Sequence, residues 1–212
     1  MIRSQLLHFL LHRLGLVAAG TQVSPGEREA LLRWASGRRR LVEIGVWHGA
    51  TTRRLREAMA EDGTLTGVDP FPPGRLGVSF PLRIALRELA RCGRGRLELL
   101  RLTGAGAAAR RAEPVDFLFI DGDHSWEGIR ADWEGWAGFV EPEGVVCLHD
   151  SRATPERPIA DAGSVRYTAE VIARDARFAV VEQVETLTIL VRGAESADAG
   201  GARPGASPPR PA

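Results

Sequence analysis

The sequence of 212 residues contains no lysine and no asparagine, so all 28 of its basic residues are arginine. This exclusive use of arginine indicates a coding bias, and abundance alone therefore assigns no function to the arginines. Aspartate and glutamate together number 27, which leaves a net charge of +1. Because neither sign of charge dominates, the composition favours neither nucleic acid nor an anionic membrane as a partner.

Cysteine is scarce, with only Cys92 and Cys147 in the chain. The two are far apart and lack the spacing of a metal-binding motif. Cys147 lies in an apolar run and is typical of a core residue. This cysteine usage fits a reducing compartment, and we expect a cytoplasmic location.

A long uninterrupted apolar run is also missing. Residues 2–19 are the nearest approach to one, but His8, His12 and Arg13 interrupt them. The segment is too short and too interrupted to span a bilayer, and its leucines recur at helical spacing. An amphipathic helix is therefore expected here.

Residues 24–27, which read SPGE, combine a serine N-cap, a proline at the first helical position and the glutamate of a capping box. They predict a second helix that runs to about residue 35 and stops at Gly37. We assign residues 1–37 to an N-terminal element that caps the domain or supports a homo-oligomer.

The most informative segment is 41–51, which reads LVEIGVWHGAT. A short apolar run, the glycines Gly45 and Gly49, and a helical pattern over 52–60 indicate a strand, a tight turn and a helix start. Glycine is needed where a ligand approaches the backbone. The G-x-x-x-G spacing differs from the G-x-G-x-x-G of pyrophosphate sites, and Glu43 would favour a cationic ligand group instead.

A second acidic residue follows this turn at the spacing expected in a βαβ unit. The predicted strand 64–68 ends at Asp69, which follows Gly49 by 20 residues. A carboxylate in this position of a βαβ unit accepts both hydroxyl groups of a ribose. The proline-rich segment 70–80 that follows is expected to form a loop over the ligand.

Two further strands end in titratable residues. The apolar run 115–120 leads into DGDHSWEG, which begins with Asp121 and contains His124, and the run 145–148 ends in His149 and Asp150. Adjacent parallel strands end at one edge of a sheet, so we expect these side chains to lie together. Carboxylates near histidines are suited to acid–base chemistry and to a divalent cation.

The full pattern predicts an α/β fold with a Rossmann-like, doubly wound sheet of seven mostly parallel strands and a terminal antiparallel strand. Residues 38–193 form this domain, and the Pro-, Ala- and Gly-rich residues 194–212 are expected to be disordered. Aromatic residues from Trp126 to Phe139 follow a helical stripe that indicates packing on the sheet. The expected strands are 41–44, 64–68, 96–102, 115–120, 145–148, 178–182 and 186–191.

The segment from about residue 41 to residue 192 resembles the class I S-adenosylmethionine-dependent methyltransferases. VEIGVWHG resembles the macrocin O-methyltransferase group. DGDHSWEG resembles the related cephalosporin-hydroxylase-like and methyltransferase-24-type groups. The resemblance implies an O-methyltransferase that acts on a hydroxyl group of a small molecule, in particular a sugar on a natural product.

The resemblance also implies roles for particular residues. S-adenosylmethionine would be bound by Glu43, Gly45, Gly49, Asp69, Thr103 and Asp121. Magnesium or manganese would be held by Asp121 and Asp150, although His149 replaces the first member of the acidic pair that the relatives carry. Histidine is a poorer magnesium ligand than a carboxylate, so a weaker or manganese-preferring site is expected.

Methyl transfer to a hydroxyl needs alignment with the methyl carbon and removal of a proton. Asp121, His124 and His149 are the candidate catalytic groups, with a hydrogen-bonded turn residue as the alternative for His124. Two other functions remain open from the sequence. The chain could be a non-catalytic partner with a methyltransferase fold or, with less support, a dinucleotide-dependent oxidoreductase.

Overall fold

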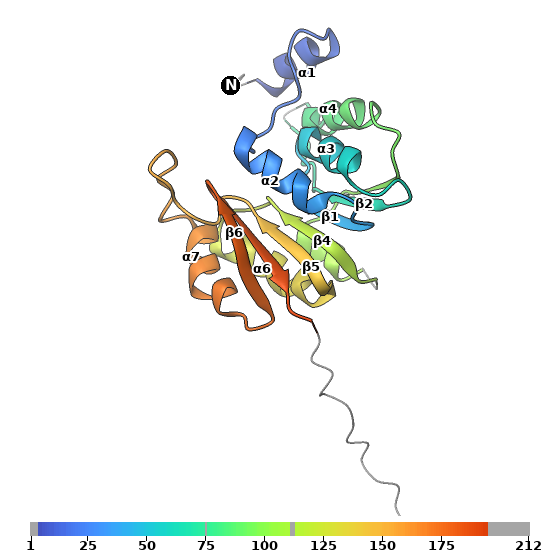
Figure 1. Cartoon of the computed structure of the whole chain (residues 1–212). Coiled ribbons are helices and arrows are strands. Elements are labelled where there is room, and N and C mark those ends of the chain that lie inside the picture. Colours follow the sequence, from blue (N-terminus) through green and yellow to red (C-terminus); the bar gives the residue numbers. More distant parts are fainter. Residues whose placement is uncertain (1–3, 75, 111–112, 195–212) are drawn as a thin grey trace, which may run out of the picture.

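The computed structural model describes residues 4–74, 76–110 and 113–194. Its seven strands form one sheet in the order β3-β2-β1-β4-β5-β7-β6 (Figure 1). Neighbouring strands from β3 to β5 run parallel, and β7 runs antiparallel to both β5 and β6. The strands are β1 (Arg40–Ile44), β2 (Thr64–Val68), β3 (Arg96–Leu100), β4 (Val115–Ile120), β5 (Val140–Leu148), β6 (Phe178–Val184) and β7 (Leu187–Arg192).

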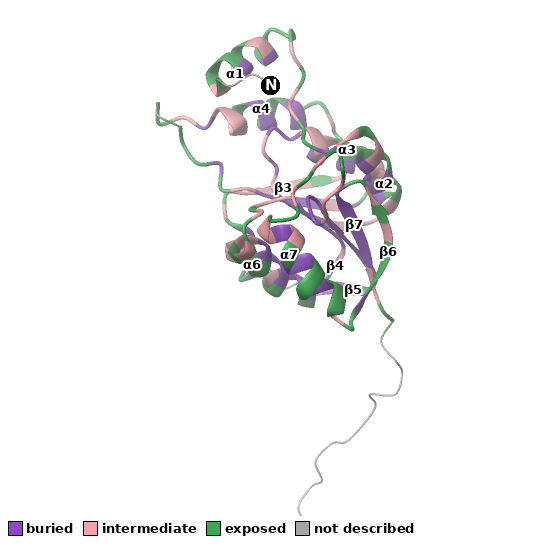
Figure 2. Cartoon of the chain, turned by 90° about the vertical axis from the view of Figure 1, so that its left-hand side faces the viewer, coloured by how far each residue is buried: buried purple, intermediate pink, exposed green. Residues whose placement is uncertain are grey.

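Helices cover both faces of the sheet. One core cluster joins the sheet to α5, α6 and α7, and a second joins the opposite face to α2 and α3. α1 lies at one end of the molecule and packs on α4, as Figures 1 and 2 show. The helices are α1 (Gln5–Arg13), α2 (Pro25–Ala35), α3 (Ala50–Ala58), α4 (Phe80–Leu89), α5 (Gly104–Ala108), α6 (Trp126–Trp136) and α7 (Gly163–Glu170), with 3₁₀ turns at Ala137–Phe139 and Ile172–Arg174.

Strand alternation explains the two cores. Val42 and Ile44 of β1 face the α6 side, whereas Leu41 faces the α2 side, because successive side chains of a strand point to opposite faces. Strands covered on both faces read as continuous apolar runs, as β4 does. Figure 2 shows the central strands as buried and the outer strand β6 as largely exposed.

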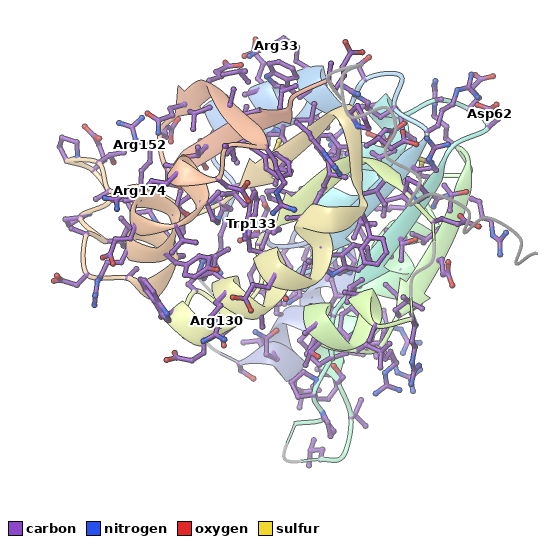
Figure 3. All side chains as sticks on the ribbon, turned by 90° about the horizontal axis from the view of Figure 1, so that it is seen from below. Arg33, Asp62, Arg130, Trp133, Arg152 and Arg174 are labelled. Carbon is purple, nitrogen blue, oxygen red and sulfur yellow. The ribbon has the colours of Figure 1, made fainter. Side chains whose placement is uncertain are left out.

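The aromatic stripe of α6 packs on the sheet, as its spacing predicts. Trp133 and Trp136 are buried in the core, and Figure 3 shows Trp133 inside the molecule while Arg130 of the same helix lies at its periphery. The Trp136 indole Nε1 donates to the Gly104 carbonyl oxygen at 2.9 Å. This bond ties α6 to the start of α5.

The fold class and the seven predicted strands are confirmed. Two local predictions were incomplete. β5 begins at Val140, five residues before the expected strand 145–148, and its pairing with β4 shifts between Val115 and Phe117. Residues 104–108 form a short helix that was not predicted, with the Thr103 side chain as its N-cap.

The two helices predicted in the N-terminal region are present, and the second starts where the sequence predicted. Ser24 and Glu27 form the reciprocal capping box of α2, and α1 begins at the Ser4 N-cap. In the part of the chain that the structure describes, no helix is long and apolar enough to cross a membrane. The predicted disordered tail lies, apart from residue 194, outside the described residues.

Candidate active site

The carboxyl ends of β1, β2 and β4 open into a cavity of about 720 Å³. Its walls include the β1 turn, Asp69 at the end of β2, the first residues of α5, and the segment from Asp121 into α6. Ligands in open α/β sheets bind at this edge, where the connecting loops diverge. Four of the predicted cofactor residues, Gly45, Asp69, Thr103 and Asp121, line this cavity.

The β1 turn needs its two glycines for different reasons. Gly45 has a φ of +96°, and a Cβ added to it would lie 2.0 Å from the Asp121 carbonyl oxygen. Gly49 has a φ of +74° and begins α3, where an added Cβ would lie 3.2 Å from the Ala85 Cα. Gly45 therefore lets β1 and β4 end side by side under the cavity, whereas Gly49 lets α3 pack against α4.

Asp69 fastens the β1 turn to the end of β2. Its two carboxylate oxygens accept hydrogen bonds from the backbone N–H of Trp47 at 2.8 Å and of Phe71 at 2.7 Å. Each carboxylate oxygen can accept a second hydrogen bond. The carboxylate is therefore oriented by the backbone and still has acceptor capacity toward the cavity.

Glu43 occupies a different environment from the one its predicted role suggests. Its side chain is fully buried beneath α3 and is not part of the cavity wall. Neither carboxyl oxygen forms a hydrogen bond in the described structure. Burial raises the pKa of Glu43 well above its ordinary value, the nearby Asp121 and Asp69 raise it further, and the Thr52 hydroxyl opposes the shift. Its contact with a cofactor stays a prediction.

Another carboxyl group in the cavity wall was missed from the sequence. Asp132 of α6 is 6% exposed, and burial, followed by the charge of Asp123, raises its pKa to about 7. It occupies the inward stripe of α6, which it shares with Ile129, Trp133 and Trp136. The sequence signal for Asp132 is an acidic residue on an otherwise apolar helix face.

The candidate catalytic residues do come together. His124 Nε2 lies 3.7 Å from Asp121 Oδ1 and 3.9 Å from Asp150 Oδ2. Both Asp121 and His124 line the cavity, and the His124 side chain is 37% exposed. His124 can therefore meet a substrate.

His149 is enclosed between two carboxylates and is 1% exposed. Its Nδ1 lies 2.8 Å from Asp121 Oδ1, without the alignment of a hydrogen bond, and its Nε2 lies 3.5 Å from Glu27 Oε2. Burial alone would lower the pKa of His149, but the contacts with Asp121 and Glu27 outweigh burial and raise it to about 10. The imidazole is therefore positively charged near neutral pH.

Glu27 is the partner that the sequence did not reveal. Burial alone would raise its pKa, but interactions with His149, Thr186 and the Ser24 backbone lower it to about 2. Its Oε1 accepts from the Thr186 backbone N–H at 2.9 Å and from the Thr186 hydroxyl at 2.6 Å. A residue of the N-terminal element thus supports the edge of the sheet.

These residues do not fit the magnesium site that the resemblance implies. Asp150 Oδ2 is bound by the Arg157 guanidinium, and Asp121 already faces the charged His149. Asp121, His124 and His149 present ligand atoms within 4.8 Å of one another, but His149 would have to lose its proton to bind an ion. Magnesium prefers oxygen ligands, and the positive charge here is supplied by His149 and Arg157.

A second cavity of about 540 Å³ adjoins this cluster. Its walls are polar and include Glu27, His149, Arg157 and Thr186. Gln22 contributes to both cavities, which places them next to each other. The candidate catalytic residues therefore stand between two binding spaces.

The segment between α1 and α2 forms part of the wall of the first cavity. The Gly20 backbone N–H donates to His48 Nδ1 at 3.1 Å, and the Thr21 and Thr51 hydroxyls lie 3.2 Å apart. Gln5 of α1 meets His48 Nε2 at 3.0 Å. The N-terminal element is therefore attached directly to the β1 turn.

A seven-stranded sheet of this order, with a ligand cavity at the carboxyl ends of its parallel strands, defines the fold of the class I methyltransferases. Residues 42–151 match the family model described as a methyltransferase domain, type 24. This stretch is more than half of the chain, and the chain therefore belongs to the methyltransferase-24-type family. The match favours this interpretation over a dinucleotide oxidoreductase.

Two mycobacterial relatives carry the provisional name O-methyltransferase. Proteins from Mycobacterium avium and Mycolicibacterium paratuberculosis are each 29% identical over 162 residues, which cover 70% of this chain. The match spans 66% of the length of each relative, just under two thirds.

Solved structures share the fold. An O-methyltransferase from Bacillus cereus in complex with S-adenosylhomocysteine matches with a TM-score of 0.60 and 20% identity, covering 91% of this chain and 93% of that one. The O-methyltransferase TomG from Streptomyces achromogenes, involved in tomaymycin synthesis and bound to S-adenosylmethionine, matches with a TM-score of 0.59 and 18% identity over 91% of each chain.

Proposed function

We propose that this protein is an S-adenosylmethionine-dependent O-methyltransferase that methylates a hydroxyl group of a small molecule, specifically a sugar on a natural product. The observation that carries the proposal is the placement of His124 and Asp121 in the wall of a donor-sized cavity, next to a second, polar cavity. Donor and acceptor would meet at this point, where an ionisable group is available.

The donor is expected to bind in the larger cavity. Asp69 would accept its ribose hydroxyls, and the cavity wall at Gly45 and Asp121 would face its amino-acid part. The sulfonium of a donor bound in this way would lie near His124.

The acceptor is expected to bind in the second cavity. A wall of carboxylate, imidazole, guanidinium and hydroxyl groups suits a ligand with many hydroxyl groups, which is the chemistry of a sugar. The acceptor oxygen would reach the methyl group past Gln22, which both cavities share.

The reaction needs one base. The acceptor oxygen attacks the methyl carbon, the carbon–sulfur bond breaks, and its electron pair returns to sulfur, which yields S-adenosylhomocysteine. The hydroxyl proton passes to His124 Nε2, while Asp121 and Asp150 stabilise the imidazolium that forms. His149 is already protonated and buried, so we assign it the role of orienting Asp121.

The overall proposal is tested with labelled S-adenosylmethionine and a panel of glycosylated metabolites. Transfer of the label to an acceptor is the expected result. Thermal shifts with S-adenosylhomocysteine and with NADH provide a second readout, since only a ligand of the native state raises the melting temperature. Binding of the donor without transfer to any acceptor would favour the non-catalytic partner instead.

Replacing Asp69 with alanine should weaken S-adenosylhomocysteine binding by about 1.5–3 kcal/mol, because the ribose loses its charged acceptor. Titration calorimetry measures the change, and a melting curve of the apo variant shows whether the β1 turn remains folded. Unchanged affinity in a folded variant would contradict the assigned ribose contact.

Metal dependence separates our mechanism from the one the resemblance implies. Because His149 and Arg157 already neutralise the carboxylates, excess EDTA should leave kcat within about twofold of its untreated value. Adding Mg²⁺ or Mn²⁺ should change it equally little. A loss of activity that Mn²⁺ restores would instead support the predicted metal site at Asp121 and Asp150.

A further inference from the structure

The carboxyl group of Asp132 lies in the wall of the larger cavity, next to Gly104 at the start of α5 and to Gly122 just after β4. A Cβ added to Gly104 would lie 2.0 Å from Asp132 Oδ1, and one added to Gly122 would lie 3.1 Å from Oδ2. The carboxyl group therefore bridges the space between the start of α5 and the end of β4. A side chain at position 104 would therefore collide with this acid, and one at position 122 would press against it.

Asp132 has no hydrogen-bond or ion-pair partner among the residues that the structure describes. It is 94% buried, and its only charged neighbour of consequence is another acid, Asp123. Its oxygens are not among the fully enclosed side-chain atoms that lack a hydrogen-bond partner, so the carboxyl group opens onto the cavity. A ligand that donates a hydrogen bond into the cavity would supply the missing partner.

The proposed contacts of the donor leave one part of the cavity wall unassigned. The sulfonium would lie near Asp121 and His124, and the ribose would lie at Asp69. The remaining end of the cavity is formed by the first residues of α5 and by Gly128 and Asp132 of α6. A donor bound in this direction places its adenine at that end.

We propose that Asp132 selects the adenine of the methyl donor by accepting a hydrogen bond from its 6-amino group. The inference rests on the proposed function, since it concerns the same donor. The 6-amino group of adenine is a hydrogen-bond donor, and the oxygen of a carboxylate or a carboxamide accepts from it. The sequence offers no acid after β3 for this contact, and α6 supplies it from across the cavity.

The test compares two ligands and three variants by titration calorimetry. The ligands are S-adenosylhomocysteine and its analogue in which hydrogen replaces the 6-amino group. The variants are Asp132→Ala, Asp132→Asn and Glu134→Gln. Glu134 is an exposed residue of the same helix and does not line the cavity, so its variant controls for a loss of charge from α6.

The wild type and Glu134→Gln should bind the deamino analogue about tenfold to a hundredfold more weakly than S-adenosylhomocysteine, the range for a hydrogen bond to a charged group. Asp132→Ala should bind both ligands with the weaker affinity. Asp132→Asn should retain a preference for the amino-bearing ligand, because its amide oxygen still accepts.

Two results would overturn the inference. One is equal affinity of the wild type for both ligands. The other is a loss in Asp132→Ala that affects both ligands alike while the preference persists, which indicates that Asp132 only supports the packing of α5 and α6. If the wild type binds neither ligand, the proposed function itself fails.

Discussion

Replacing His124 with alanine is expected to lower kcat by about 10²–10⁴-fold, the range for loss of a general base. The affinity for S-adenosylhomocysteine should change by no more than about twofold, because the proposed contacts that hold the donor are with Asp69 and Asp121. Steady-state kinetics with a saturating acceptor measures the first effect, and calorimetry measures the second. The split between the two separates a catalytic group from one that merely shapes the pocket.

Arg130→Ala provides the matched control for His124→Ala. Arg130 lies on α6 at the periphery of the molecule and pairs with the exposed Glu134, so its loss should leave kcat within about twofold (Figure 3). An alanine variant at His124 that keeps more than a tenth of the wild-type kcat would assign the proton transfer to another group.

The meeting of the acidic residues at the carboxyl edge of the sheet could be predicted, because the order of the strands, rather than detailed packing, brings these residues together. Once β1, β2, β4 and β5 are recognised as parallel neighbours, Asp69, Asp121 and Asp150 must finish at one edge. Gly45 was identified for a different reason, the expected approach of a ligand to its backbone, whereas its close contact in the structure is with the end of the adjacent strand.

The residues that were missed contact residues that are far from them in the sequence, and no local sequence pattern predicts such contacts. Glu27 was recognised only as part of a capping box, yet its other oxygen meets Thr186 and its charge faces His149. Asp132 is one helical turn from core residues and reaches the cavity only because α6 packs beside α5. The pairing of Arg157 with Asp150 likewise depends on a loop whose path has no readable pattern.

The contact between Glu27 and His149 predicts a large effect on stability. Replacing Glu27 with glutamine should lower the free energy of unfolding by about 3–5 kcal/mol, the range for removing one partner of a buried ion pair. The amide would also misalign the bonds to the Ser24 N–H, since it places a donor where an acceptor is needed. Glu29→Gln, an exposed change on the same helix, should shift stability by no more than about 0.5 kcal/mol.

The pH dependence of this stabilisation follows from the two shifted pKa values. The pKa of His149 rises from 6.5 to about 10 on folding, so its contribution is complete below pH 6.5 and is lost as the pH rises toward 10. The pKa of Glu27 falls from 4.5 to about 2, so its contribution is complete above pH 4.5 and is lost as the pH falls toward 2. The pair therefore stabilises the fold most between about pH 4.5 and 6.5.

Urea unfolding of the wild type and of Glu27→Gln across this range measures the effect directly. The difference in unfolding free energy should be largest between about pH 4.5 and 6.5 and should shrink toward both pH 10 and pH 2, because one partner loses its charge at each extreme. Glu29→Gln should follow the wild type at every pH. A difference for Glu27→Gln that stays constant with pH would mean that Glu27 stabilises the fold only through its hydrogen bonds to Thr186 and Ser24, and that His149 is neutral.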